Sequence, residues 1–334
     1  MPHSVIGTQI DDFRITELVG DGASGWVYGA THTRTQRRAA LKLMRRELSA
    51  NETITARFLK EAQTINGVGH PNIVEVLGTG RYQGRPYVVM ELLRGETLEK
   101  RLERVKRLDV KQAMPIFLEC ADALAAAHDR HIVHRDIKPE NIYIAQREDG
   151  SETTKLLDFG IAKLLDTSAP AVTQLGAIVG TPQYMSPEQC LGEDSLDQRS
   201  DIYSMALVLY RMVTGELPYV ITNHHLMLYV MAHTQQNPRA PRTLVPELPG
   251  LLETVILRAL SKQPDHRYPD LRAMASALAP LRSGKETMAM VSALVDENLV
   301  AALAPDPARP RRAAAALARF VLEGIHAGNL QLPS

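Results

Sequence analysis

The sequence predicts an α+β protein with a small strand-rich N-terminal lobe, which contains one main helix, and a larger helical C-terminal lobe. Short apolar runs broken by glycines fill residues 13–91 and are typical of strands. From about Glu96 onward, apolar residues recur at helical spacing in longer segments. At about 150 residues per domain, a chain of 334 residues has room for two domains or one two-lobed unit.

The composition is that of an ordinary globular protein, with 45% hydrophobic residues, 23% charged residues and a formal net charge of zero. This charge balance does not indicate a nucleic-acid or anionic-membrane partner. Two cysteines, Cys120 and Cys190, cannot form a disulfide framework, which favours a reducing compartment. The N-terminus lacks a signal-peptide core, and no apolar run reaches the roughly 18 residues of a membrane span. We therefore expect a soluble, cytoplasmic chain.

The N-terminal lobe is predicted over about 13–91. The segments FRITELVG, GWVYGATH and RRAALKLM alternate or run apolar in short bursts, which predicts successive strands. A helix is expected at about 53–67, and strands at NIVEVLGTG and PYVVMELL follow it.

The C-terminal lobe is predicted over about 96–281. AMPIFLECADALAAAHDRH has helical spacing, and NIYIA and TKLLDF are expected to be short strands joined by the polar segment QREDGSE. DIYSMALVLYRMVTG is too hydrophobic for a surface helix and is expected at the centre of this lobe. Residues 282–334 are Ala-rich and amphipathic, which predicts a helical extension. Its role, protein interaction or packing, stays open.

A glycine-rich turn is the first candidate binding element. LVGDGASGWVYG contains Gly20, Gly22 and Gly25, and a strand-like run follows the glycines where a dinucleotide-binding fold would have a helix. A hairpin turn of this kind lets backbone N–H groups approach phosphate oxygens, although a plain glycine hairpin is the alternative. Lys42, at the end of an apolar strand, could reach such phosphates. A buried ammonium needs a carboxylate partner, and Glu61 on the following helix is the candidate.

The loop VHRDIKPENIYI, residues 133–144, places polar groups between two apolar runs that resemble strands. Asp136 can orient a substrate hydroxyl and accept its proton, and Lys138 can neutralise charge on a transferring phosphoryl group. Asn141 can hold a divalent metal through its amide oxygen. Asp158, in KLLDFG, is a second hard oxygen ligand of the type that Mg²⁺ prefers.

Together with Ser186-Pro187-Glu188, these motifs resemble a protein kinase in their order and spacing. Several segments are similar in sequence to the eukaryotic-like (Hanks-type) serine/threonine kinases of bacteria, the PknB-like group. They are KEAQ, HPNIV, VMELLRGETL, VGTPQYMSPEQ and RSDIYS. The resemblance covers residues 13–281 and implies the two-lobed kinase fold, with a small antiparallel sheet in the N-terminal lobe.

The resemblance also implies how ATP is bound. It assigns the phosphates to the glycines and Lys42, and the adenine pocket to Met90 as gatekeeper, to the backbone of two hinge residues, and to three side chains above and below the base. The full set is Gly20, Gly22, Gly25, Val27, Ala40, Lys42, Met90, Glu91, Leu93 and Tyr143. The family usually has Leu or Met where Tyr143 stands. Stacking on adenine, a narrowed pocket and an ordinary core aromatic all stay open there.

Further roles are implied by the same motifs. Thr181 would contact Asp136 and Lys138, Glu188 would pair with Arg267, and Asp201 would brace the catalytic-loop backbone. In the regulatory segment, Arg135 would receive an activation-loop phosphate. Thr173 is the expected autophosphorylation site, with Leu175 where relatives have a second threonine.

The sequence therefore predicts a serine/threonine protein kinase that uses ATP and Mg²⁺, with Mn²⁺ as an alternative metal, in bacterial signalling. Protein substrates are the expected partners, and the resemblance implies transient pairing of N-terminal lobes. The alternative is a pseudokinase-like nucleotide-binding scaffold. The metal-binding and proton-accepting residues Asn141, Asp158 and Asp136 are all present, which favours catalysis.

Overall fold

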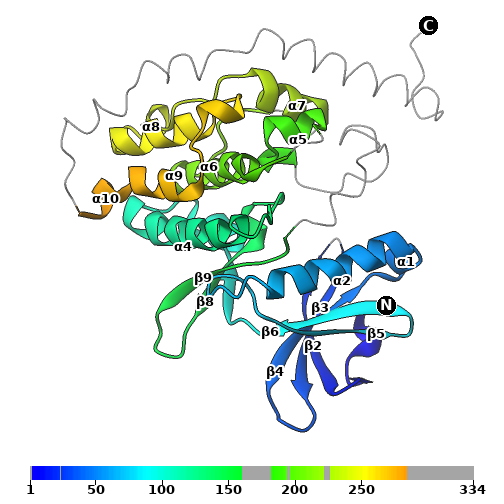
Figure 1. Ribbon diagram of the computed structural model, residues 1–334. Coiled ribbons are helices and arrows are strands. Elements are labelled where there is room, and N and C mark those ends of the chain that lie inside the picture. Colours follow the sequence, from blue (N-terminus) through cyan, green and yellow to red (C-terminus); the bar gives the residue numbers. More distant parts are fainter. Residues whose placement is uncertain (1, 23, 160–181, 194–195, 222–225, 284–334) are drawn as a thin grey trace, which may run out of the picture. The chain divides into compact units, whose positions relative to one another are not determined.

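The computed structural model describes residues 2–22, 24–159, 182–193, 196–221 and 226–283 (Figure 1). The chain forms two compact units, one from Met1–Glu96 with Tyr143–Leu165 and one from Thr97–Ile142 with Asp166–Ser334. The first unit is discontinuous, because residues 143–165 join it although they follow the start of the predicted C-terminal lobe. The predicted extension over 282–334 lies outside the described residues except for its first two positions.

An antiparallel sheet forms most of the first unit. Its strand order is β1-β2-β3-β4-β6-β5, and each neighbouring pair is antiparallel. The strands are β1 Gln9–Ile10, β2 Phe13–Asp21, β3 Gly25–His32, β4 Arg38–Met44, β5 Val76–Tyr82 and β6 Arg85–Glu91. One face buries a cluster that includes Ile15, Tyr28, Leu41 and Val89. The small antiparallel sheet predicted for this lobe is confirmed.

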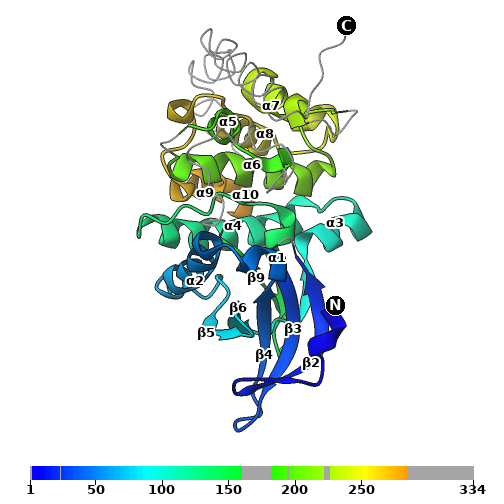
Figure 2. The same cartoon turned by 90° about the vertical axis from the view of Figure 1, so that its right-hand side faces the viewer.

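Two helices cover the sheet, the short α1 (Arg46–Ser49) and the longer α2 (Glu52–Asn66). The Asn51 side chain caps α2 by accepting a hydrogen bond from the backbone N–H of Ile54. The α2 helix packs against β5 and β6 (Figure 2). Phe58 of α2 belongs to the same buried cluster as Met44 and Val88.

A second, three-stranded sheet explains why residues 143–165 join the first unit. It consists of β7 Gly95–Thr97, β8 Ile142–Gln146 and β9 Glu152–Leu156, in that order. The strand predicted from Asn72 begins only at Val76 in β5, because Asn72 and Val74 bond to β9 instead. The backbone N–H of Val74 donates to the Leu156 carbonyl, and that of Leu156 donates to the Asn72 carbonyl.

The second unit is helical. Its central helix is α6, Gln198–Thr214, which is buried along most of its length and contacts α4, Val110–His128, and α8, Gly250–Ala259 (Figure 1). Around these lie α3 Leu98–Val105, α5 Pro187–Leu191, α7 Leu226–Gln235, α9 Leu271–Ala277 and α10 Ala279–Ser283. Single-turn 3₁₀ helices include η2 Pro139–Asn141 and η4 Pro182–Tyr184. Within the described ranges, no helix has both the length and the apolar character needed to cross a bilayer.

Candidate functional site

The predicted phosphate-binding turn connects β2 to β3, and we call residues 20–22 and 24–25 the glycine flap. Hydrogen bonds of 3.0 and 3.3 Å join the backbones of Gly22 and Gly25 in both directions. A Cβ at Gly25 would lie 2.4 Å from the Leu43 carbonyl oxygen, so the fold itself requires glycine there. A Cβ at Gly20 or Gly22 would meet its nearest atom at 3.8 or 3.4 Å, an ordinary contact. The fold therefore tolerates a Cβ at these two positions, so packing alone does not require glycine there.

Lys42 lies within β4, two residues before its end, and not at the last position as predicted. Its side chain is 90% buried, and Nζ lies 2.6 Å from Oδ1 of Asp158, whose side chain is half exposed. Asp158 has a φ of 41°, in the left-handed region that non-glycine residues rarely adopt. Glu61 lies in α2, but its side chain lies outside what the structure describes, so its predicted pairing with Lys42 stays a prediction.

All but one of the residues predicted to surround adenine lie on β3, β4, β6 and β8. In the sheet register, Val27 is opposite Lys42 and Ala40 is opposite Met90. Leu93 follows β6, and Tyr143 lies in β8 with its side chain partly buried, which raises the Tyr143 pKa.

The predicted hinge residue Glu91 ends β6, and its side chain is anchored by contacts that no local sequence pattern indicates. Its Oε1 accepts from Lys155 Nζ at 2.6 Å and from the Glu75 backbone N–H at 2.9 Å. The Glu91 backbone N–H already donates to the Glu75 carbonyl at 3.0 Å. A hinge hydrogen bond from Glu91 must therefore use its own carbonyl group.

In the second unit, the polar loop gathers its predicted catalytic residues around the Asp136 carboxylate. Lys138 Nζ lies 3.2 Å from Asp136 Oδ2. Asn141 Nδ2 donates to the Asp136 carbonyl at 2.8 Å and to Oδ2 at 3.1 Å. Because its amide nitrogen makes these contacts, the atom that Asn141 would offer to a cation is Oδ1, the type of ligand that Mg²⁺ prefers. Val133, expected to end a strand, lies in none.

Asp201, fully buried near the N-terminus of α6, holds the backbone of this loop. Oδ2 accepts from the His134 N–H at 2.8 Å and contacts His128 Nε2 at 2.7 Å, and Oδ1 accepts from the Arg135 N–H at 2.8 Å. Burial alone would raise the Asp201 pKa, but His128 and these N–H groups outweigh it, so the pKa is lowered. His128 thus helps to hold Asp201 in place, a role that no sequence motif indicated.

Arg135 adopts a φ of 64°, and its carbonyl accepts from Gln189 Nε2 at 2.9 Å. Its Nε and Nη1 atoms are buried and have no hydrogen-bond partner among the described residues. Burial accordingly lowers the Arg135 pKa. A partly buried cation with unused donors is suited to receive an anion. The predicted phosphate acceptor Thr173, and Thr181, lie outside the described residues.

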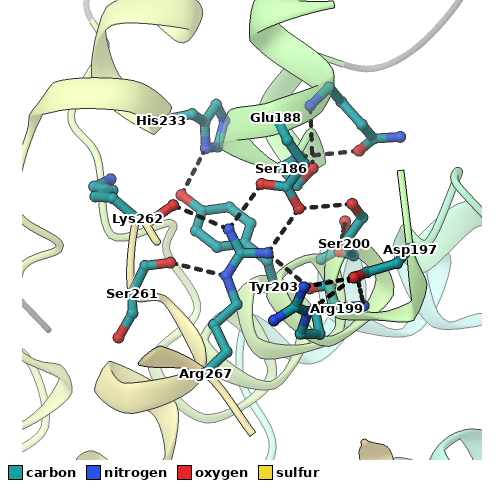
Figure 3. Close-up of polar contacts among 12 residues, drawn as sticks. Ser186, Glu188, Asp197, Arg199, Ser200, Tyr203, His233, Ser261, Lys262 and Arg267 are labelled. Carbon is teal, nitrogen blue, oxygen red and sulfur yellow. Dashed lines mark hydrogen bonds and ion pairs between the residues drawn. The ribbon is translucent and has the colours of Figure 1, made fainter. Parts of the chain in front are cut away.

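Glu188 and Arg267 lie at the centre of a buried polar cluster (Figure 3). Arg267 Nη1 lies 2.7 Å from Glu188 Oε1, and Ser200 donates to the same oxygen at 2.6 Å. The cluster extends to Tyr203, whose ring lies 5.0 Å from the Arg267 guanidinium carbon. This arrangement ties α5 to α6 and to the segment before α9.

The two units thus carry the residue set of a protein kinase. The protein kinase domain family matches residues 13–276, and the chain belongs to this family. Serine/threonine-protein kinase Pkn1 of Myxococcus xanthus is 38% identical over 274 residues, which are 82% of this chain and 39% of Pkn1. Pkn3 of the same organism is 36% identical over 309 residues, 91% of this chain and 55% of pkn3. The predicted resemblance to bacterial serine/threonine kinases is confirmed.

Mycobacterial proteins show the same similarity. PknB of Mycobacterium tuberculosis is 35% identical over 279 residues, which are 82% of this chain and 44% of PknB. The chain therefore spans about two fifths to just over half the length of these curated relatives. The crystal structure of the M. tuberculosis PknI kinase domain matches with a TM-score of 0.64 and 26% identity, covering 82% of this chain and 98% of that domain. The predicted kinase fold is confirmed.

Proposed function

We propose that this chain is an active serine/threonine protein kinase, which transfers the γ-phosphate of ATP to hydroxyl groups of protein substrates. The observation that carries the proposal is the Asp136 carboxylate, which lies between the Lys138 ammonium and the Asn141 amide. A carboxylate held in this way can orient an acceptor hydroxyl and take its proton. The acceptor oxygen forms a bond to the γ-phosphorus, the bond to the β-phosphate oxygen breaks, and ADP leaves. Lys138 would offset the charge on the transferring group.

The first unit would bind the nucleotide. Gly20 and Gly22, where packing does not require glycine, would let phosphates approach the backbone of the glycine flap, and Lys42 would bind the α- and β-phosphates. Asp158 of this unit and Asn141 of the second unit each carry an oxygen donor of the type that suits Mg²⁺, with Mn²⁺ as an alternative. When bound, the cation neutralises phosphate charge. Tyr143 and the carbonyl of Glu91 would contact adenine.

Serine or threonine as the acceptor is supported by Lys138, which stands two positions after Asp136 as in the similar serine/threonine kinases, and by the names of the curated relatives. Regulation would follow from the unused donors of Arg135, which suit a phosphate on Thr173. Consumption of ATP and two free, buried cysteines favour action in the bacterial cytoplasm. Transient pairing of N-terminal lobes is part of the same proposal.

Intact-mass measurement of the purified chain before and after incubation with Mg-ATP tests the proposal. We expect steps of one phosphate for the wild type and a loss of at least about 100-fold in rate for Asp136→Asn. A parallel titration with Mg-ADP should show nucleotide binding by both proteins. Binding without phosphate gain in the wild type, also with a general acceptor protein present, would favour the pseudokinase-like scaffold instead.

A further inference from the structure

Arg45 directly follows the last residue of β4 and contacts the glycine flap, although it is not part of the β2–β3 hairpin that carries the flap. Nε donates to the Gly22 carbonyl at 3.2 Å, and Nη2 forms an ion pair with the Asp21 carboxylate. The Arg45 backbone N–H donates to the Ser24 carbonyl at 3.1 Å. One residue therefore contacts three positions of the turn, on both sides of its tip.

The Arg45 side chain also packs over the ring of Trp26, in β3. Its guanidinium carbon lies 5.0 Å from the ring centroid, and that of Arg85 lies 5.2 Å from the same centroid. Arg85 in turn donates through Nε to the Met44 carbonyl at 2.9 Å, directly before Arg45. Arg45 is thus supported by an aromatic surface and by the adjoining strand β6.

The ladder between β2 and β3 shows why such a contact matters. Its last pair is Asp21 with Trp26, so beyond it the turn is closed by the two Gly22–Gly25 hydrogen bonds of the hairpin itself. Asp21 and Gly22 are solvent-exposed. An exposed glycine-containing turn with few contacts opens easily, because glycine has much conformational freedom to lose on ordering.

We propose that Arg45 is a positioning residue that latches the glycine flap to the strand carrying Lys42. Lys42 lies three residues before Arg45, so the latch joins the two elements that would hold the nucleotide phosphates. By ordering the turn before the nucleotide arrives, Arg45 reduces the ordering entropy that binding must overcome. The role rests on the proposed nucleotide binding, and Arg45 acts through the backbone of Gly22 without contacting the ligand.

The test compares Arg45→Met with Arg46→Ala, which removes the same charge at the exposed neighbouring position. Trp26 is the only tryptophan of the chain, so its fluorescence reports directly on the environment of the latch. Each purified protein of 334 residues is titrated with Mg-ADP by calorimetry and by Trp26 emission. We expect Arg45→Met to weaken binding about tenfold and Arg46→Ala to stay within about twofold of the wild type.

Steady-state kinetics separate positioning from general damage. The KM for ATP should rise about tenfold in Arg45→Met while kcat falls less than about threefold, because bound nucleotide itself orders the flap. Asp21→Asn removes the exposed partner of the ion pair and should also raise the KM for ATP. If Arg45→Met does not fold, this variant tests whether the ion pair positions the glycine flap. Equal Mg-ADP affinities for wild type, Arg45→Met and Asp21→Asn would overturn the latch. A wild type that binds no nucleotide would overturn the proposed function as well.

Discussion

Arg267 and Glu188, which are 79 residues apart in sequence, form a bidentate ion pair, with Nη1 2.7 Å from Oε1 and Nη2 2.8 Å from Oε2. Both side chains are almost fully buried. Burial by itself raises the Glu188 pKa, but Arg267 and the Ser200 hydroxyl outweigh it and hold the pKa at about 2. The pair therefore makes folding stability depend on pH.

Glu188→Gln should remove part of the acid sensitivity of folding. The folded-state pKa of about 2 lies below the ordinary 4.5, so the carboxylate stabilises the fold above about pH 4.5 and this contribution is lost as the pH falls toward 2. The shift corresponds to about 3 kcal/mol at neutral pH. Urea unfolding at pH 7 and at pH 3 measures it. The difference between the free energies of unfolding at pH 7 and at pH 3 should be smaller in Glu188→Gln than in the wild type. The control Glu148→Gln, at an exposed position, should show the wild-type difference. A wild-type difference in Glu188→Gln would contradict the assignment.

Asp201→Asn should destabilise the catalytic loop. The carboxylate accepts hydrogen bonds from two backbone N–H groups and contacts His128. In Asp201→Asn one of the two oxygens becomes an NH₂ group, which cannot accept a hydrogen bond from the donor that faces it. We expect a loss of about 1–3 kcal/mol in the free energy of unfolding and a larger fractional loss of kcat than of nucleotide affinity. Asp265→Asn, whose side chain is 87% exposed, is the control. Parallel losses of kcat and nucleotide affinity would argue against a role specific to the loop.

Lys155→Ala should weaken ATP binding and leave the rate of phosphoryl transfer nearly unchanged. Removing the ammonium leaves the partly buried Glu91 carboxylate without its ion pair, so the hinge backbone loses an anchor. We expect the KM for ATP to rise about three- to tenfold with kcat within about twofold. The exposed Lys111→Ala is the matched control. If both variants give the wild-type KM, the Glu91 side chain does not position the hinge.

Phosphorylation should stabilise the chain through Arg135. Its buried Nε and Nη1 have no hydrogen-bond partner among the described residues, and a phosphate would supply charged acceptors. Incubation with Mg-ATP should raise the Tm of the wild type by several degrees, for about 1–2 kcal/mol of new contacts. Thr173→Ala should lose both the phosphate and the Tm increase. Arg135→Gln, phosphorylated by added wild-type enzyme, should carry the phosphate without the increase, and Thr167→Ala should behave as wild type.

The sequence alone was sufficient for the fold class and for the identity of the chemical groups. Strand and helix periods are local properties, so β2, β3, β4, α2 and α6 were predicted within a few residues. The residues of the catalytic loop are close in sequence, and their order alone indicated phosphoryl transfer. The matched family then confirmed the kinase resemblance.

The tertiary structure decided which groups meet. Lys42 contacts Asp158 across 116 residues, Glu91 is anchored by Lys155 across 64, and Arg45 reaches back to the glycine flap. The hairpin that carries Lys155 bonds to the segment before β5, and so joins the first unit. Local periodicity records which side chains are buried, but a charged side chain pairs with whatever partner the chain's path brings within about 3 Å. That path depends on strand pairing and packing, which a reading of the sequence by local pattern does not contain.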